Sequence, residues 1–241
     1  MAAGEPGIRA TSSGARFMER RLGLAARHLS RGVPCFAVFD IDNTLVDTRP
    51  RTLHMARTFD RDNGSSWFRS LTLRTTGVDA ADTCARVGGV PAGVRRRFEA
   101  AWRDGFWNPA NFALDRPVKP VIAWAKRAHA AGLGVRLLTG RWTLFEQTSV
   151  AQLRRAGMSF VEVEHTYHKP SPRVWTKAYK AQVIRELMGR GFVAWYVTES
   201  RLEVAHIQTV VRGAPCVLAD CSLEPKSIHV RPRTPRLART F

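Results

Sequence analysis

The chain contains 241 residues, of which 44% are hydrophobic. A chain of this size can bury the core of one α/β domain with an insertion, or of two small domains. No apolar stretch approaches the ~20 residues of a membrane-spanning helix, so the sequence predicts no transmembrane segment. The four cysteines lack the spacing of a zinc site.

The charge balance is strongly basic, since 38 Lys and Arg residues against 20 Asp and Glu residues give a formal net charge of +18. Such a charge favours negatively charged partners, such as phosphorylated metabolites or nucleic acid. Arginines spread along the whole chain are, however, equally typical of a GC-rich coding sequence. No basic stretch is interleaved with aromatic residues that would stack bases. The charge therefore allows nucleic acid as a partner without indicating it.

Residues 1–32 are expected to form a basic leader and a helix. Residues 1–15 are rich in Gly, Ala and Ser, and the apolar positions of 17–29 loosely fit an amphipathic helix. A leader with several Arg and few acidic residues also fits an organelle transit peptide. Cys35 and Cys216 each begin an apolar run, which predicts buried thiols in a reducing compartment such as the cytoplasm.

Short apolar runs and amphipathic stretches alternate along most of the chain. The apolar runs, each predicted to be a strand buried on both faces, cover residues 35–39, 134–138, 159–163, 192–197 and 215–218. The stretches with helical periodicity cover residues 118–131, 143–156 and 174–190, and each is followed by a Gly typical of a helix C-terminus. This alternation predicts an α/β fold with a Rossmann-like, doubly wound parallel sheet.

Residues 49–115 break this alternation. They contain polar turns, a helix-like segment at 92–104 and several aromatic residues, but no convincing buried strand. Because so long an interval is rarely a structureless loop, we expect a small, mainly helical insertion. The predicted organisation is a core of residues 33–48 and 116–222, this insertion, and a basic tail of residues 223–241.

Polar side chains follow three of the predicted strands. They are Asp40 and Asp42 after the first strand, Thr139 and Gly140 after the second, and Glu199 with Glu203 after the fourth. In a doubly wound sheet, ligands bind where the carboxyl ends of the strands meet. We therefore expect these residues to line one site.

The stretch FDIDNTLV at residues 39–46 resembles the first motif of the haloacid dehalogenase (HAD) phosphohydrolases, an apolar strand followed by DxDxTLxD. The TGR at 139–141 resembles their second motif. Glu199 with Glu203 resembles the acidic fourth motif, with Glu199 in place of the more usual Asp. The resemblance covers residues 35–220 and implies a Rossmann-like core, a helical cap in the insertion, and Mg²⁺-dependent phosphoester hydrolysis.

The resemblance also implies a role for each residue. Asp40 would be the nucleophile, and Asp42 would protonate the leaving oxygen and then deprotonate water. Asp40, the backbone carbonyl of Asp42, and Glu199 would hold Mg²⁺, which prefers oxygen ligands. The hydroxyl group of Thr139, the amide of Gly140 and a lysine would bind the phosphoryl oxygens.

The phosphate-binding lysine has three candidates within HKPSPRVWTKAYKAQVI. Lys180 best resembles the relatives, because it stands near the start of the helix that leads to the fourth-motif strand. Lys177 and Lys169 are the alternatives. Arg141 is interpreted as structural rather than catalytic.

Three functions remain open at this point. The first is a Mg²⁺-dependent phosphatase that acts on a phosphorylated small molecule through an aspartyl-phosphate at Asp40. The second is a catalytically idle binding or regulatory protein. Glu199 is one methylene longer than the usual Asp, and with Glu203 it could instead form a solvated helix face. The third is a phosphatase of nucleic-acid ends, which would use the charge of +18.

Overall fold

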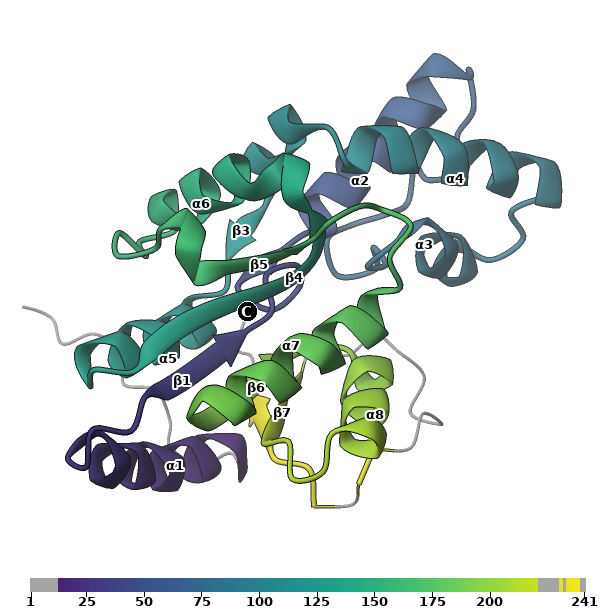
Figure 1. Ribbon diagram of the computed structural model, residues 1–241. Helices are drawn as coiled ribbons and strands as arrows, with labels where there is room; N and C mark the ends of the chain where they lie inside the picture. Colours follow the sequence, from purple (N-terminus) through teal and green to yellow (C-terminus); the bar gives the residue numbers. More distant parts are fainter. Residues whose placement is uncertain (1–12, 221–229, 232, 239–241) are drawn as a thin grey trace, which may run out of the picture. The chain divides into compact units, whose positions relative to one another are not determined.

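The computed structural model describes residues 13–220, 230–231 and 233–238 (Figure 1). The first part of the predicted leader, residues 1–12, and most of the predicted tail lie outside the described residues. The chain divides into two compact units, residues 1–45 with 118–241 and residues 46–117. None of the described helices is long and apolar enough to cross a membrane.

The larger unit is built on a six-stranded parallel sheet. In pairing order its strands are β5 (Thr166–Lys169), β4 (Gly134–Trp142), β1 (Cys35–Phe39), β6 (Phe192–Thr198), β7 (Cys216–Asp220) and β8 (Arg236–Ala238). All neighbouring strands run parallel. β1, the first strand along the chain, lies inside the sheet, and later strands add on both of its sides. This order confirms the predicted doubly wound sheet.

Helices cover both faces of this sheet (Figure 1). α1 (Ser13–Leu29) and α5 (Lys119–Ala130) pack on one face, whereas α7 (Thr176–Arg190) and α8 (Arg201–Val210) pack on the other. A 3-10 turn (Thr143–Phe145) and α6 (Glu146–Arg155) follow β4. The predicted helices of the core are therefore present, with small shifts of their bounds.

β1 shows why a strand inside a parallel sheet appears in the sequence as a continuous apolar run. Successive side chains of a strand point to opposite faces. Phe36 and Val38 join the core beneath α7 and α8. Phe39 contacts Trp195 edge to face on the other side, and Trp195 contacts Trp124 of α5 in the same way. Both faces are buried, so every position of the strand must be apolar.

One predicted strand is wrong. Residues 159–163 form no strand; the last of them begins a 3-10 turn, Val163–His165, and the edge strand β5 begins at Thr166. Val161 is fully buried in this connection, so the apolar run reflects a loop packed on the core. β4 is also longer than predicted, because it continues through residues 139–142.

The smaller unit, residues 46–117, is mainly helical, as predicted. Its elements are β2 (Val46–Asp47), α2 (Arg49–Asp62), α3 (Ala80–Val87), α4 (Ala92–Phe106), a 3-10 helix (Pro109–Leu114) and β3 (Arg116–Pro117). Phe59, Phe68 and Phe98 form an aromatic cluster at the centre of its core. β2 and β3 pair antiparallel where the chain enters and leaves the unit.

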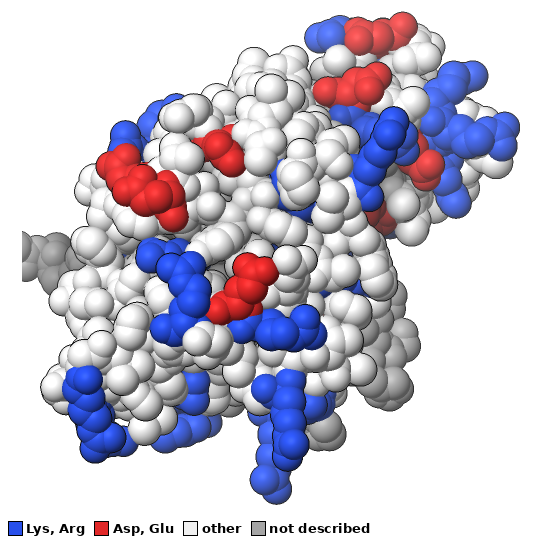
Figure 2. Space-filling model, in the orientation of Figure 1, with Lys and Arg blue, Asp and Glu red and all other residues white. Residues whose placement is uncertain are grey.

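Charges are scattered over the face of the molecule that Figure 2 shows. Lys and Arg side chains occur across this face, and Asp and Glu side chains lie between them. A nucleic-acid-binding surface is usually a clustered basic patch or stripe. The distribution on this face therefore adds no support for nucleic acid as a partner.

Candidate active site

Asp40 lies directly after the central strand β1, at the carboxyl edge of the sheet. Its N–H donates to the carbonyl of Val197 in β6, 2.9 Å away, and the residue is 4% exposed. Asn43 then adopts a left-handed backbone conformation, with φ of 54°. Asn tolerates this conformation better than most residues, so the local sequence itself turns the chain over the end of the strand.

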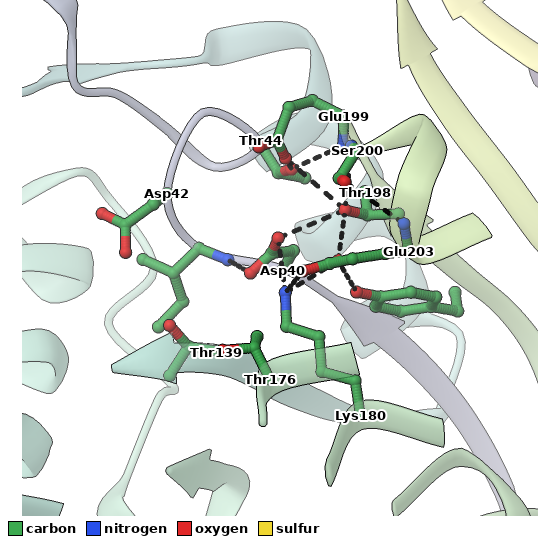
Figure 3. Close-up of polar contacts among 12 residues, drawn as sticks. Asp40, Asp42, Thr44, Thr139, Thr176, Lys180, Thr198, Glu199, Ser200 and Glu203 are labelled. Atoms are coloured by element: carbon green, nitrogen blue, oxygen red, sulfur yellow. Dashed lines mark hydrogen bonds and ion pairs between the residues drawn. The ribbon is translucent and has the colours of Figure 1, made fainter. Parts of the chain in front are cut away.

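Lys180, on α7, is brought to Asp40 (Figure 3). Its Nζ lies 2.8 Å from Asp40 Oδ2 and donates to both oxygens of Glu203, at 2.8 and 2.9 Å. Burial alone would lower the pKa of Lys180, but the carboxylates of Asp40 and Glu203 outweigh it and raise that pKa. The site therefore contains a buried ammonium group whose charged form is favoured by the two carboxylates.

The other two lysine candidates have different partners. Lys169, at the end of β5, donates to the carbonyl of Val174 and to the hydroxyl group of Thr176, both at 3.1 Å. Lys177 lies over the ring of Trp175, with Nζ 5.4 Å from the ring centroid. Of the three, Lys180 is the lysine that forms an ion pair with Asp40.

Glu203 faces the interior, so the alternative of a solvated helix face is wrong for this residue. Its N–H is capped by the hydroxyl group of Ser200 at 3.2 Å, and it is 8% exposed. Tyr196 donates to Glu203 Oε2 at 2.9 Å. Thr198 Oγ1 lies 3.0 Å from the same oxygen and 3.2 Å from Asp40 Oδ2. Glu203 thus anchors Lys180 and Thr198 beside Asp40.

Glu199 lies beside Asp40 and is oriented by Thr44. The N–H of Glu199 donates to Thr44 Oγ1 at 3.1 Å, and the Thr44 hydroxyl donates to Glu199 Oε2 at 2.9 Å. Thr198 Oγ1 lies 3.5 Å from the same Glu199 oxygen and 3.2 Å from Asp40 Oδ2. The carboxylates of Asp40 and Glu199 are therefore gathered around one hydroxyl group.

The electrostatics of these acids fit a bound cation. Burial, reinforced by Glu203, raises the pKa of Asp40 to about 7, although Lys180 opposes this rise. Burial and then the charge of Asp40 raise the pKa of Glu199 well above its ordinary value. Both carboxylates would ionise more readily beside a divalent cation.

The donor set also fits Mg²⁺. Among the described residues, no three His, Cys, Asp or Glu side chains gather as metal ligands. With only the carboxylates of Asp40 and Glu199 as charged ligands, a cation at this site would need further oxygen ligands. The backbone carbonyl of Asp42 and water would supply them. Mg²⁺ is commonly held by one or two carboxylates with several waters.

Thr139 and Gly140 lie within β4, which extends past the predicted strand end. Thr139 is fully buried, and its Oγ1 accepts the N–H of Arg141 at 3.1 Å. A Cβ atom at Gly140 would lie 3.1 Å from Thr176 Cγ2, so the backbone passes close to α7 at this point. In Figure 3, Thr139 and Thr176 lie on the same side of Asp40.

The carboxylate of Asp42 points away from Asp40 (Figure 3). Arg141 donates to both of its oxygens, from Nε at 2.9 Å and from Nη2 at 2.8 Å. The side chain of Asp42 is 20% exposed, whereas that of Arg141 is fully buried. Asp42 is thus held at the margin of the site, within reach of water.

Three hydroxyl-bearing residues of the site, Thr44, Tyr196 and Thr198, were assigned no role from the sequence. Tyr196 and Thr198 are fully buried in β6. A hydroxyl group in a strand covered on both faces needs a hydrogen-bond partner, and that requirement was the signal available in the sequence. Thr44 belongs to the first motif, where its position after two acids was a similar signal.

The fold matches solved structures. They include a protein from Clostridium difficile provisionally described as a phosphatase (TM-score 0.61, 12% identity, covering 86% of this chain and 94% of that one). A haloacid dehalogenase-like hydrolase from Streptococcus pneumoniae has a TM-score of 0.57 at 10% identity, over 87% and 95% of the two chains. Protein tyrosine kinase A of Mycobacterium tuberculosis has a TM-score of 0.56 at 16% identity, over 87% and 94%. No family model and no curated protein matches the sequence. The chain therefore shares its fold with HAD-like hydrolases. A shared fold does not by itself define an activity.

Proposed function

We propose that this protein is a Mg²⁺-dependent phosphohydrolase that acts on a phosphorylated small molecule through an aspartyl-phosphate at Asp40. The observation that carries the proposal is the position of Asp40, buried at the end of the central strand, with Lys180 at 2.8 Å and Glu199 beside it. A HAD-like fold, which hydrolases and a protein described as a phosphatase share, supports it.

Asp40 and Glu199 would each bind the metal through a carboxylate oxygen, and Asp42 would bind it through its carbonyl group. When bound, Mg²⁺ would neutralise these carboxylates and polarise the phosphoryl oxygens. Thr44 keeps the Glu199 carboxylate oriented through its two hydrogen bonds. Such supporting contacts tune metal affinity in proteins.

The phosphoryl group would be transferred in two displacements. In the first, Asp42 would hold a proton taken up with the phosphomonoester. A carboxylate oxygen of Asp40 bonds to phosphorus, the bond from phosphorus to the leaving oxygen breaks, and Asp42 gives its proton to that oxygen. In the second, Asp42 takes a proton from water, the water oxygen bonds to phosphorus, and the Asp40–phosphorus bond breaks. The products are an alcohol and inorganic phosphate, and both acids return to their starting states.

Binding of the phosphoryl oxygens would fall to Lys180, Thr139 and the amide of Gly140. Positive charge and hydrogen-bond donors aimed at these oxygens stabilise the charge that they carry in the transition state. Lys180 is already fixed by Asp40 and Glu203, so it need not reorganise during the reaction.

The test is hydrolysis of p-nitrophenyl phosphate by the purified full chain, with Mg²⁺ and with excess EDTA, beside Asp40→Asn. We expect turnover that requires Mg²⁺ and falls at least about 10³-fold in Asp40→Asn, because no covalent intermediate can form. The matched control is Asp62→Asn, which alters an exposed aspartate of α2 paired with Arg61. It should keep full activity.

Two results would contradict the proposal. One is turnover that Asp40→Asn leaves unchanged. The other is an absence of Mg²⁺-dependent turnover on p-nitrophenyl phosphate and on a panel of nucleotides and sugar phosphates, which would favour the idle binding or regulatory protein. Trapping with BeF₃⁻ and Mg²⁺, read as a rise in thermal stability that Asp40→Asn abolishes, adds a readout independent of substrate choice.

A further inference from the structure

The guanidinium group of Arg141 donates hydrogen bonds from all three of its nitrogens. Its side chain is fully buried, and it donates to both carboxylate oxygens of Asp42. The remaining terminal nitrogen, Nη1, donates to Ser149 Oγ at 3.0 Å and to Gln152 Oε1 at 2.9 Å. The guanidinium group is therefore hydrogen-bonded on two sides, to Asp42 on one and to α6 on the other.

The α6 side of this arrangement consists of two uncharged side chains. Ser149 and Gln152 are three residues apart on α6, so they share one face of the helix. His168 Nε2 lies 3.2 Å from Ser149 Oγ. Burial, and then the charge of Arg141, lower the pKa of His168 to about 4, so this imidazole is neutral at pH 7. The support thus orients Arg141 without competing with Asp42 for its charge.

The geometry of phosphoryl transfer determines where the carboxyl group of Asp42 has to lie. The attacking and leaving oxygens lie roughly in line on opposite sides of phosphorus. The group that protonates the leaving oxygen must therefore stand away from the nucleophile. An acid free to turn towards Asp40 would crowd the metal ligands and could not reach the leaving oxygen. Figure 3 shows the Asp42 carboxylate turned away from Asp40, as this requirement demands.

We propose that Arg141 is a positioning residue that holds the Asp42 carboxyl group away from Asp40, facing the leaving oxygen of the substrate. The inference rests on the proposed function, because it assigns a task to Asp42 within that reaction. Ser149 and Gln152 act through Arg141 by fixing the plane of its guanidinium group. Arg141 acts through Asp42 and needs no contact with the substrate.

The test uses substituted phenyl phosphates of similar size whose leaving groups differ in basicity, from p-nitrophenyl to p-methoxyphenyl phosphate. A good leaving group departs without a proton, whereas a poor one needs the general acid. kcat/KM reports the steps up to the departure of the leaving group. In Arg141→Gln, its loss on p-methoxyphenyl phosphate should exceed its loss on p-nitrophenyl phosphate by at least about tenfold. Arg141→Lys keeps the charge but not the bidentate contact. Its dependence of kcat/KM on the leaving group should lie between that of Arg141→Gln and that of the parent.

A double-mutant cycle separates positioning from general stabilisation. Asp42→Asn should show the same steep dependence on the leaving group. Adding Arg141→Gln to Asp42→Asn should then change kcat/KM by less than about twofold, because the residue through which Arg141 acts is already disabled. The control is Arg127→Gln, which removes an exposed arginine paired with Glu19 and should leave the leaving-group dependence unchanged.

Independent losses that multiply in the double variant, or an unchanged leaving-group dependence in Arg141→Gln, would overturn the inference. If Arg141→Gln does not fold, Ser149→Ala removes one support of the guanidinium group and should steepen the dependence by a smaller factor; an unchanged dependence there would equally overturn it. An absence of Asp40-dependent turnover in the parent protein would instead overturn the proposed function, and this inference with it.

Discussion

Glu203 binds Lys180 through both carboxylate oxygens, at 2.8 and 2.9 Å, in a part of the core that water scarcely reaches. Lys180 is in turn 2.8 Å from Asp40. The lysine therefore owes its position to an acid that need not itself react. Because both partners are buried, the loss of either charge has consequences for folding as well as for catalysis.

Glu203→Gln should impair both stability and turnover. The amide keeps one acceptor for Lys180 but removes a charge, so the free energy of unfolding should fall by about 1.5–3 kcal/mol, the usual contribution of a hydrogen bond to a charged group. kcat should fall more than KM rises, because Lys180 would be less firmly held on the transferring group. Urea unfolding and steady-state kinetics measure both. Glu186→Gln, at an exposed position of α7, is the control, and an equal effect there would contradict the assigned role.

Thr44→Val should weaken metal binding rather than abolish catalysis. The substitution removes both hydrogen bonds to Glu199 while nearly preserving shape. Loss of such a supporting contact typically costs about 10- to 100-fold in metal affinity. The Mg²⁺ concentration for half-maximal activity should rise accordingly, with kcat largely restored at saturating Mg²⁺. Titration calorimetry with Mg²⁺ checks the affinity directly, and an unchanged Mg²⁺ requirement would remove Thr44 from this role.

His168 should make the protein less stable in acid. Burial lowers its pKa to about 4 from an ordinary 6.5, so between these values the unfolded chain binds a proton that the folded chain does not. Stability is then fully present above about pH 6.5 and falls with decreasing pH, by at most about 1.4 kcal/mol per pH unit and about 3 kcal/mol in all. Urea unfolding at several pH values should show a shallower acid loss in His168→Gln. His54→Gln, at an exposed position of α2, should follow the parent, and parallel curves for all three proteins would refute the assignment.

Arg51 and Asp115 should stabilise the smaller unit only as a pair. Both side chains are fully buried, and Arg51 donates to the two Asp115 oxygens at 3.0 and 2.7 Å and to the carbonyl of Phe106 at 2.7 Å. Asp115→Ala leaves a buried, uncompensated charge and should cost about 3–5 kcal/mol, whereas Arg51→Met with Asp115→Leu should cost less. Hydrogen exchange in α2 and α4 reports on this unit specifically. Additive costs in the double variant would contradict the coupling.

Much of the fold followed from local patterns. The strand at residues 35–39 was predicted with the bounds that the structure has, because five consecutive apolar residues before an acid leave little alternative. The same reasoning was wrong for residues 159–163. An apolar loop that packs on the core has the same composition as a short buried strand, and β5 instead begins at Thr166, where the chain pairs with β4.

The sequence by itself determined which residue types meet at the carboxyl edge of the sheet, because Asp40, Thr139 and Glu199 each follow a recognisable strand. Only the tertiary structure decided among the lysines and assigned partners to the acids. Lys177 and Lys180 stand three residues apart on one helix, so their periodicity is nearly the same, and the position of α7 along the sheet selects Lys180. Arg141 and Asp42 lie 99 residues apart in the chain. Their contact exists because β1 and β4 are neighbours in the sheet, a pairing that local periodicity does not encode.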